Sequence, residues 1–188
     1  GLGRLARCRL ALLYLPALDL WLAGDPAAVV ADAMERLQPW TLVGAAAPGA
    51  VVEVRGAKAV SLYQASRAAT YLALSPAPPL LPGGTIALQA ACTEGLGVES
   101  GFCAALAGGP PWTELLEGPA PTGAGAQRAV MLALLAARYR LVVYGVDDPA
   151  PLRAVGIEAH REPAPEQPTW LRVPDPFQSL PQLGQRPT

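Results

Sequence analysis

The sequence predicts an α/β fold, in which a largely parallel sheet carries helices on both faces and a β-hairpin opens the chain. Two nearly continuous apolar runs, Thr85–Cys92 and Leu141–Val146, have the pattern of parallel strands buried on both faces. Helix-like segments alternate with the strand-like runs, which is the order of an α/β protein. With 188 residues and 52% apolar residues, we expect one domain over residues 1–175 and a flexible tail over residues 176–188.

The composition argues against several classes of protein. The net charge of −1 disfavours a nucleic-acid-binding protein, which would carry a basic patch. No run approaches the roughly 18 apolar residues that a membrane-spanning helix needs. The three cysteines, Cys8, Cys92 and Cys103, form no CxxC motif and suit a reducing cytoplasm. His160 is the only histidine, so we expect neither a Ser-His-Asp triad nor a self-contained transition-metal site.

The N-terminal elements follow from short local signals. Arg7–Leu15 and Leu18–Ala23 are strand-like runs on either side of a Pro-Ala turn, which predicts the hairpin. Asp25 caps a helix that begins at the proline after it and that we expect to end near Gln38, before another proline. A strand over Ala50–Val54 then leads into the stretch on which the functional interpretation depends.

That stretch is the start of a helix that Ser61 caps and that runs to about Leu74. Tyr63 and Arg67 are four residues apart and share a helix face, and Gln64 lies three residues before Arg67. A phenol, an amide and a guanidinium beside the free N–H groups of a helix N-terminus make a candidate anion site. The other interpretation, which the pattern alone favours, is a surface helix with Tyr63 half buried and the two polar side chains solvated.

A glycine-containing turn follows the strand over residues 85–92. Gly95 and Gly97 match the first two glycines of a dinucleotide-binding fingerprint, but Ser100 stands where the third should be. We therefore expect a tight turn that returns the chain from the sheet, in preference to a nicotinamide site. A helix over residues 99–106 should follow it.

Two adjacent carboxylates, Asp147 and Asp148, follow the strand over residues 141–146. Paired carboxylates can serve as acid and base or bind Mg²⁺, but the proline after this pair predicts a turn or a helix cap. Three core positions should lie on adjacent buried strands: Val52, Leu88 and Val142. The remaining expected elements are helices over residues 112–117, 126–139 and 151–155 and a strand over residues 169–173.

Five stretches form a further pattern through their order and spacing along the chain. They are Ala23–Pro26, Leu62–Arg67, Pro82–Ile86, Ala91–Gly97 and Arg138–Val143. Together they resemble the C-terminal domain of the nickel-dependent lactate racemase family. The resemblance covers roughly residues 5 to 175. It implies an α/β fold and a part in an isomerase, a racemase or epimerase that interconverts the stereoisomers of 2-hydroxy acids such as lactate.

In that family, two α/β domains enclose the active site and the cofactor is a nickel-pincer nucleotide. The catalytic histidines, the lysine that tethers the cofactor and the nickel-ligating histidine belong to the N-terminal domain, and this sequence has no counterpart of them. The resemblance therefore implies no catalytic residue and no metal ligand in this chain, which alone should be inactive. It also implies that Tyr63 and Arg67 bind the carboxylate of the substrate and that Gln64 and Gln127 contact the cofactor.

Three positions depart from the family's pattern. Arg67 replaces a lysine, the Ala-Lys-Ala of residues 57–59 replaces Pro-x-Asp, and Gln127 replaces a tryptophan. Because a planar guanidinium is not equivalent to a compact ammonium, the site is either altered for another substrate or decayed.

Two interpretations follow for the whole chain. In the first, it is one half of a racemase, and its N-terminal domain comes from the same gene product or from a separate subunit. In the second, it is a stand-alone, catalytically inactive domain that binds a small anion or a partner protein. An upstream in-frame segment with paired histidines and a lysine would favour the first, and a start codon directly before Gly1 the second.

Overall fold

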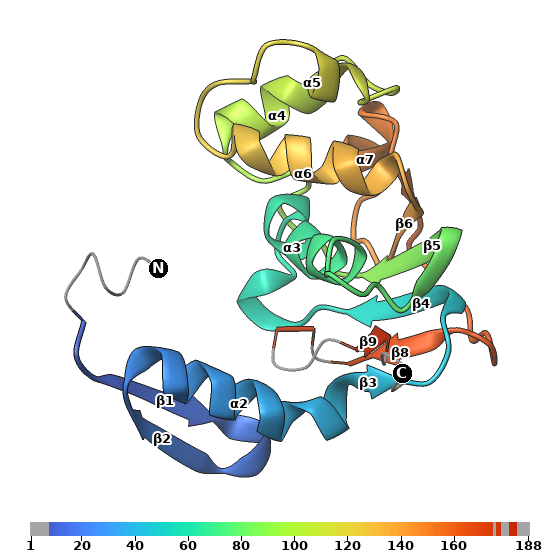
Figure 1. The fold of residues 1–188 in the computed structure, drawn as a ribbon. Coiled ribbons are helices and arrows are strands. Elements are labelled where there is room, and N and C mark those ends of the chain that lie inside the picture. Colours follow the sequence, from blue (N-terminus) through green and yellow to red (C-terminus); the bar gives the residue numbers. More distant parts are fainter. Residues whose placement is uncertain (1–7, 175, 178–180, 184–188) are drawn as a thin grey trace. The chain divides into compact units, whose positions relative to one another are not determined.

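The computed structural model describes residues 8–174, 176, 177 and 181–183 (Figure 1). The chain divides into two compact units, residues 1–42 and residues 43–188. Most of the tail predicted over residues 176–188 lies outside the described residues. Within the described part of the chain, no helix is long and apolar enough to cross a membrane.

The smaller unit is a hairpin followed by one helix. Its elements are β1 (Ala11–Leu15), the single-turn 3-10 helix η1 (Pro16–Leu18), β2 (Leu20–Gly24) and α2 (Pro26–Thr41). The two strands pair antiparallel, which confirms the predicted hairpin. Val29 and Ala33 of the helix share a small core with Leu15 and Leu22 of the strands.

Helix α2 begins where the sequence predicts but ends later. The carboxylate of Asp25 accepts hydrogen bonds from the N–H groups of Ala27 (2.9 Å) and Ala28 (3.1 Å), so Asp25 is the N-cap. The prediction that the helix ends before Pro39 is wrong, because α2 continues to Thr41. A proline in the last turn removes only one backbone hydrogen bond, and the helix runs just two residues beyond it.

The larger unit is built on a five-stranded parallel sheet with the order β7-β6-β5-β4-β8. The strands are β4 (Ala47–Glu53), β5 (Leu80–Gln89), β6 (Arg140–Tyr144), β7 (Glu158–Ala159) and β8 (Leu171–Val173). Two short strands, β3 (Leu42–Val43) and β9 (Gln182–Leu183), lie outside this sheet. Together with the hairpin, the parallel sheet confirms the predicted α/β class.

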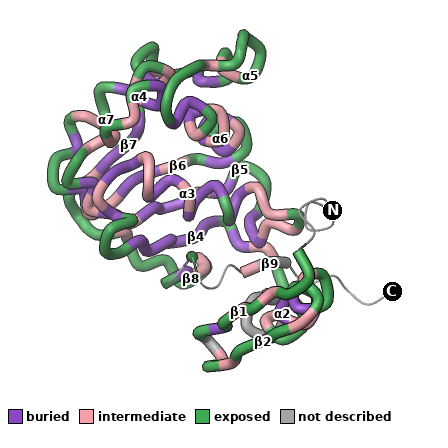
Figure 2. Tube along the Cα trace, turned by 90° about the vertical axis from the view of Figure 1, so that its left-hand side faces the viewer, coloured by how far each residue is buried: buried purple, intermediate pink, exposed green. Residues whose placement is uncertain are grey.

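The centre of the sheet is the core of the larger unit. Val52 of β4 pairs with Leu88 of β5, and Ala87 of β5 pairs with Val142 of β6. All four side chains are buried, so the predicted placement of Val52, Leu88 and Val142 on adjacent buried strands is confirmed. Figure 2 shows buried residues concentrated along β4, β5 and β6 and on α3 and α6.

Helices flank this sheet. They are α3 (Leu62–Ala73), α4 (Ser100–Leu106), α5 (Glu114–Glu117), α6 (Ala126–Ala136) and α7 (Ala150–Ala154), with a 3-10 turn η2 (Gly56–Lys58) before α3. Leu62, Ala69 and Leu72 of α3 share the core with Leu132 and Leu135 of α6. Because α3 follows β4 directly, its first turn lies at the carboxyl end of that strand, where α/β folds place their sites.

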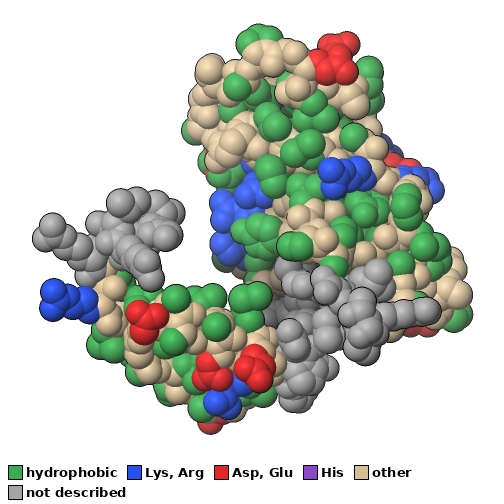
Figure 3. All heavy atoms as spheres, viewed as in Figure 1, with side chains coloured by type: hydrophobic (Ala, Val, Ile, Leu, Met, Phe, Trp, Pro, Cys, Tyr) green, Lys and Arg blue, Asp and Glu red, His purple; other side chains and the backbone are tan. Residues whose placement is uncertain are grey.

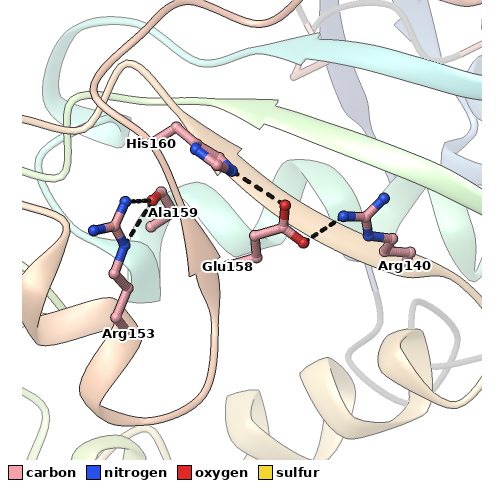
Figure 4. Close-up of polar contacts among 5 residues, drawn as sticks. All are labelled: Arg140, Arg153, Glu158, Ala159 and His160. Carbon is pink, nitrogen blue, oxygen red and sulfur yellow. Dashed lines mark hydrogen bonds and ion pairs between the residues drawn. The ribbon is translucent and has the colours of Figure 1, made fainter.

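Strand β7, which the sequence did not predict, carries a polar network at the edge of the sheet (Figure 4). Glu158 accepts hydrogen bonds from Arg140 (2.6 Å) and pairs with His160 (3.1 Å). The guanidinium of Arg153 donates twice to the carbonyl of Ala159, at 2.9 and 2.6 Å. The ring of His160 also stacks on Tyr144, so this histidine belongs to the edge of the sheet.

Candidate functional site

The first turn of α3 is held by the loop that follows β5. Ser61 is the N-cap, as predicted, and its Oγ accepts a hydrogen bond from the N–H of Gln64 (3.4 Å). The N–H groups of Leu62 and Tyr63 donate to the carbonyls of Gly95 (2.9 Å) and Leu96 (3.1 Å). The expectation that free N–H groups at this helix start bind an anion is therefore wrong, since the protein itself occupies them.

The loop after β5 is a tight turn, as the sequence predicts. Cys92 has a left-handed backbone with a φ of 46°, and its N–H donates to the carbonyl of Ala59 (2.7 Å). The N–H groups of Gly95 and Gly97 donate to the carbonyls of Cys92 (2.8 Å) and Glu94 (3.1 Å). These glycines thus have no N–H left for a nucleotide phosphate. Burial and the charge of Asp147 raise the pKa of the Cys92 thiol to about 12, so it is protonated at neutral pH.

Tyr63 is fixed in place by its neighbours. Its ring meets Phe102 edge-to-face, with the ring centroids 5.5 Å apart. Gly125 also lies against the ring, since a Cβ at Gly125 would be 2.8 Å from Cε2 of Tyr63. The guanidinium carbon of Arg67 is 5.5 Å from the centroid of the Tyr63 ring. The predicted pairing of Tyr63 and Arg67 on one helix face is therefore present, and both residues are half buried.

A second arginine, Arg128 of α6, joins this face of α3. Its Nη1 donates a hydrogen bond of 3.0 Å to Oγ1 of Thr70, and Thr70 Oγ1 donates to the carbonyl of Arg67 (3.0 Å). Burial lowers the pKa of Arg128, and the positive charge of Arg67 lowers it further, while Tyr71 and Tyr63 raise it. The positive charge of Arg67 thus acts on the guanidinium of Arg128.

Polar atoms of these residues keep unused hydrogen-bonding capacity. Gln64 Oε1, Arg67 Nε and Arg128 Nε are buried and have no hydrogen-bond partner among the described residues. Within the same residues, no ion pair joins either arginine to a carboxylate. Buried polar groups are nearly always partnered in proteins, and half-buried charges without a counter-ion are unfavourable. Two cationic donors and one acceptor suit an anion that also carries a hydroxyl group.

We call Tyr63, Gln64, Arg67, Thr70 and Arg128 the α3–α6 site. Figure 3 shows basic side chains gathered on the part of the larger unit where α3 and α6 lie.

Gln127, which the sequence singled out, is exposed, and it makes no hydrogen bond to a described side chain. Its neighbour Arg128 is the residue that reaches α3. The sequence held one signal for it: Arg128 is the single charged residue in the eleven residues of α6.

The remaining candidates from the sequence have structural places. Oδ1 of Asp148 accepts a hydrogen bond from the N–H of Ala150 (3.1 Å), which agrees with the predicted turn, and the N-cap of α7 is Pro149. No group of three or more His, Cys, Asp or Glu among the described residues could hold a metal ion. These residues therefore do not fit a nickel centre.

No protein-family model and no curated protein matches this chain by sequence. Among solved structures, the chain is similar to the lactate racemase apoprotein from Thermoanaerobacterium thermosaccharolyticum, with a TM-score of 0.70 and 14% sequence identity. The match covers 97% of this chain and 48% of that chain, so this chain spans about half the length of the racemase. At this identity the likeness shows the fold alone: the chain has a lactate racemase-like α/β fold.

Proposed function

We propose that this chain is the substrate-contacting domain of a lactate racemase-like 2-hydroxy-acid racemase or epimerase. It would act across a cleft with a second domain, which the same polypeptide or another subunit supplies. The observation that carries the proposal is the unpaired guanidinium of Arg67, placed beside Tyr63 and one turn after Gln64, whose Oε1 has no partner among the described residues. The fold of a racemase half supports it.

Each residue has a role that follows from its chemistry. Arg67 binds the carboxylate of the substrate through charge-assisted hydrogen bonds, for which a planar guanidinium is well matched. The phenol of Tyr63 donates to the same carboxylate, while Gln64 Oε1 accepts a hydrogen bond from the 2-hydroxyl group. These contacts orient the C2 carbon of the acid toward the partner domain. This chain thus binds and orients the acid, and the groups that break the bonds at C2 belong to the partner.

The described residues of this chain include no group of three or more His, Cys, Asp or Glu that could bind the nickel of the racemase family's nickel-pincer nucleotide. In this proposal the partner domain binds it, and Gln64 and Gln127 are the residues of this chain that would contact it.

The test is a calorimetric titration of lactate into the full chain and into Arg67→Ala. A charge-assisted hydrogen bond is worth about 1.5–3 kcal/mol, so the substitution should weaken binding roughly ten- to a hundredfold. Arg138→Ala is the matched control, because Arg138 is exposed and makes no ion pair with a described residue. Equal affinities of the wild type and Arg67→Ala for lactate would show that Arg67 does not bind the carboxylate.

A second arm tests the enzymatic part of the proposal. The N-terminal domain of a lactate racemase, with its cofactor, is added in trans, and racemisation of lactate is followed by polarimetry. Racemisation that depends on this chain and on Arg67 would support the proposal that the chain is one half of a racemase. Binding that depends on Arg67 without any racemisation would instead favour a stand-alone anion-binding domain.

A further inference from the structure

We propose that Arg128 is a second anion-binding residue of the α3–α6 site, and that the ligand of this site is a small acid with two negative charges. The inference rests on the proposed function of the site and extends it by naming the charge of the substrate. A hydroxy acid with two carboxylates and a simple phosphate monoester share this chemistry. A monocarboxylate such as lactate does not.

The α3–α6 site contains two positive charges. Arg67 and Arg128 are both half buried, and within the described chain neither has a carboxylate partner. Glu99 packs near Tyr63, at the same place where Gly125 meets the ring, but it forms no ion pair with either arginine. Burial is the main cause that lowers the pKa of Arg128, followed by the charge of Arg67, and the groups that raise it are two tyrosines, Tyr71 and Tyr63. A single negative charge would leave one of the two guanidinium groups without a counter-ion, whereas a dianion satisfies both.

A hydrogen bond to Thr70 fixes the position of the second cation, Arg128. Thr70 lies three residues after Arg67 on α3, a spacing that brings side chains about 5–6 Å apart at their Cβ atoms. The hydroxyl of Thr70 donates its one proton in a hydrogen bond to the carbonyl of Arg67, and it accepts a hydrogen bond from Arg128 Nη1. Arg128 is therefore held one helical turn beyond Arg67. Two anionic groups on a short carbon chain can reach both guanidinium groups at such a spacing.

The acceptor at Gln64 selects between the two kinds of dianion. Gln64 Oε1 is buried without a partner among the described residues, and it can only accept a hydrogen bond. The dianion of a phosphate monoester has no proton to donate, whereas the hydroxyl of a 2-hydroxy dicarboxylate has one. The combined donor and acceptor pattern thus fits a 2-hydroxy dicarboxylate best, with malate as the simplest probe.

The experiment compares three probes by calorimetric titration into the full chain: lactate, malate and methyl phosphate. Malate should bind at least roughly tenfold more tightly than lactate, because one further charge-assisted contact is made. Arg128→Gln should abolish this preference by lowering the affinity for malate to the affinity for lactate. Arg128→Lys keeps the positive charge and should restore part of the preference. Arg138→Gln removes an exposed arginine beyond the end of α6 and should leave all three affinities unchanged.

Equal affinities of lactate and malate in the wild type would overturn the inference and leave the proposed hydroxy-acid site standing. A malate preference that survives in Arg128→Gln would also overturn it. Binding of none of the three probes would overturn the proposed function together with the inference. Methyl phosphate that binds as tightly as malate would support a dianion site but assign it to a phosphate monoester. If Arg128→Gln does not fold, as thermal melting would reveal, the ratio of malate to lactate affinity in the wild type decides alone.

Discussion

Thr70 of α3 accepts a hydrogen bond of 3.0 Å from the guanidinium of Arg128 of α6, although the two residues are 58 positions apart in the chain. Thr70 is only 1% exposed, and its hydroxyl also donates a hydrogen bond to the carbonyl of Arg67. One buried hydroxyl therefore fixes the position of Arg128 relative to the turn of α3 that carries Arg67. The packing of the two helices and the arrangement of the candidate site depend on the same contact.

Thr70→Val tests this contact because valine keeps the shape of threonine and lacks the hydroxyl. We expect the free energy of unfolding to fall by about 1–3 kcal/mol, since a hydrogen bond from a charged group is lost. Chemical denaturation would measure it. Thr113→Val is the control, at an exposed threonine whose side chain caps no helix. Equal losses in the two variants would show that the hydroxyl of Thr70 does not hold the helices together.

Gly125→Ala tests how Tyr63 is held. Gly125 has a φ of 78°, and a Cβ there would lie 2.8 Å from Cε2 of Tyr63. Backbone strain of about 1–2 kcal/mol and overpacking of about 1–3 kcal/mol should both destabilise this variant. Gly83→Ala is the matched control, because Gly83 has a φ of 75° and a Cβ there would meet no described atom within 4 Å. The excess loss of stability at Gly125, measured by denaturation, reports the contact with the ring. No excess would mean that the ring yields without cost.

The start of α3 shows what could and what could not be predicted from the sequence. The cap at Ser61 is a local signal, since a hydroxyl residue precedes a helical pattern, and the structure confirms it. That Gly95 and Leu96 occupy the next N–H groups is not a local property. It requires the loop after β5 to fold back over the helix start, with Cys92 in a left-handed conformation that cysteine seldom adopts. The expectation of free N–H groups failed for this reason.

The two ends of the candidate site differ in the same way. Tyr63 and Arg67 lie on one helix, so their shared face follows from a spacing of four residues. Arg128 reaches them from another helix, and its place depends on how α6 is rotated against α3. An error of one residue turns a helix by about 100°, because an α-helix has 3.6 residues per turn. Gln127, selected through the resemblance to the racemase family, is exposed, and its neighbour Arg128 is the residue that contacts α3. Strand β7 was missed because two residues carry no periodic pattern.

The stability of the larger unit should depend on pH through Glu53. This buried carboxylate accepts hydrogen bonds from Arg172 (2.8 Å) and Arg55 (2.6 Å), and the bond from Arg172 is the main cause that lowers its pKa below the usual 4.5. Since the folded-state pKa is the lower one, the ionised carboxyl stabilises the fold above pH 4.5. That contribution is lost as the pH falls through the folded-state pKa.

Glu53→Gln should therefore flatten the acid limb of a plot of unfolding free energy against pH, and lower the stability at neutral pH. Glu158→Gln is the comparison. The pKa of Glu158 is also lowered, first by Arg140 and then by His160, but its side chain is 41% exposed, so solvent screens the pair. An acid limb that is unchanged in Glu53→Gln would show that the loss of stability in acid has another origin.

Tyr63→Phe separates the phenol hydroxyl from the ring that carries it. The contacts of the ring with Phe102 and Arg67 remain in phenylalanine, and the hydroxyl makes no hydrogen bond to a described residue, so the free energy of unfolding should stay nearly constant. Lactate binding should weaken roughly two- to tenfold, because one neutral hydrogen bond contributes about 0.5–1.5 kcal/mol. Titration calorimetry and chemical denaturation of the same preparation measure the two quantities. Tyr144→Phe removes the hydroxyl of a tyrosine at the end of β6 that stacks on His160, and it should change neither. A loss of stability with unchanged affinity in Tyr63→Phe would make the hydroxyl structural and leave Arg67 as the only group of α3 that binds the carboxylate.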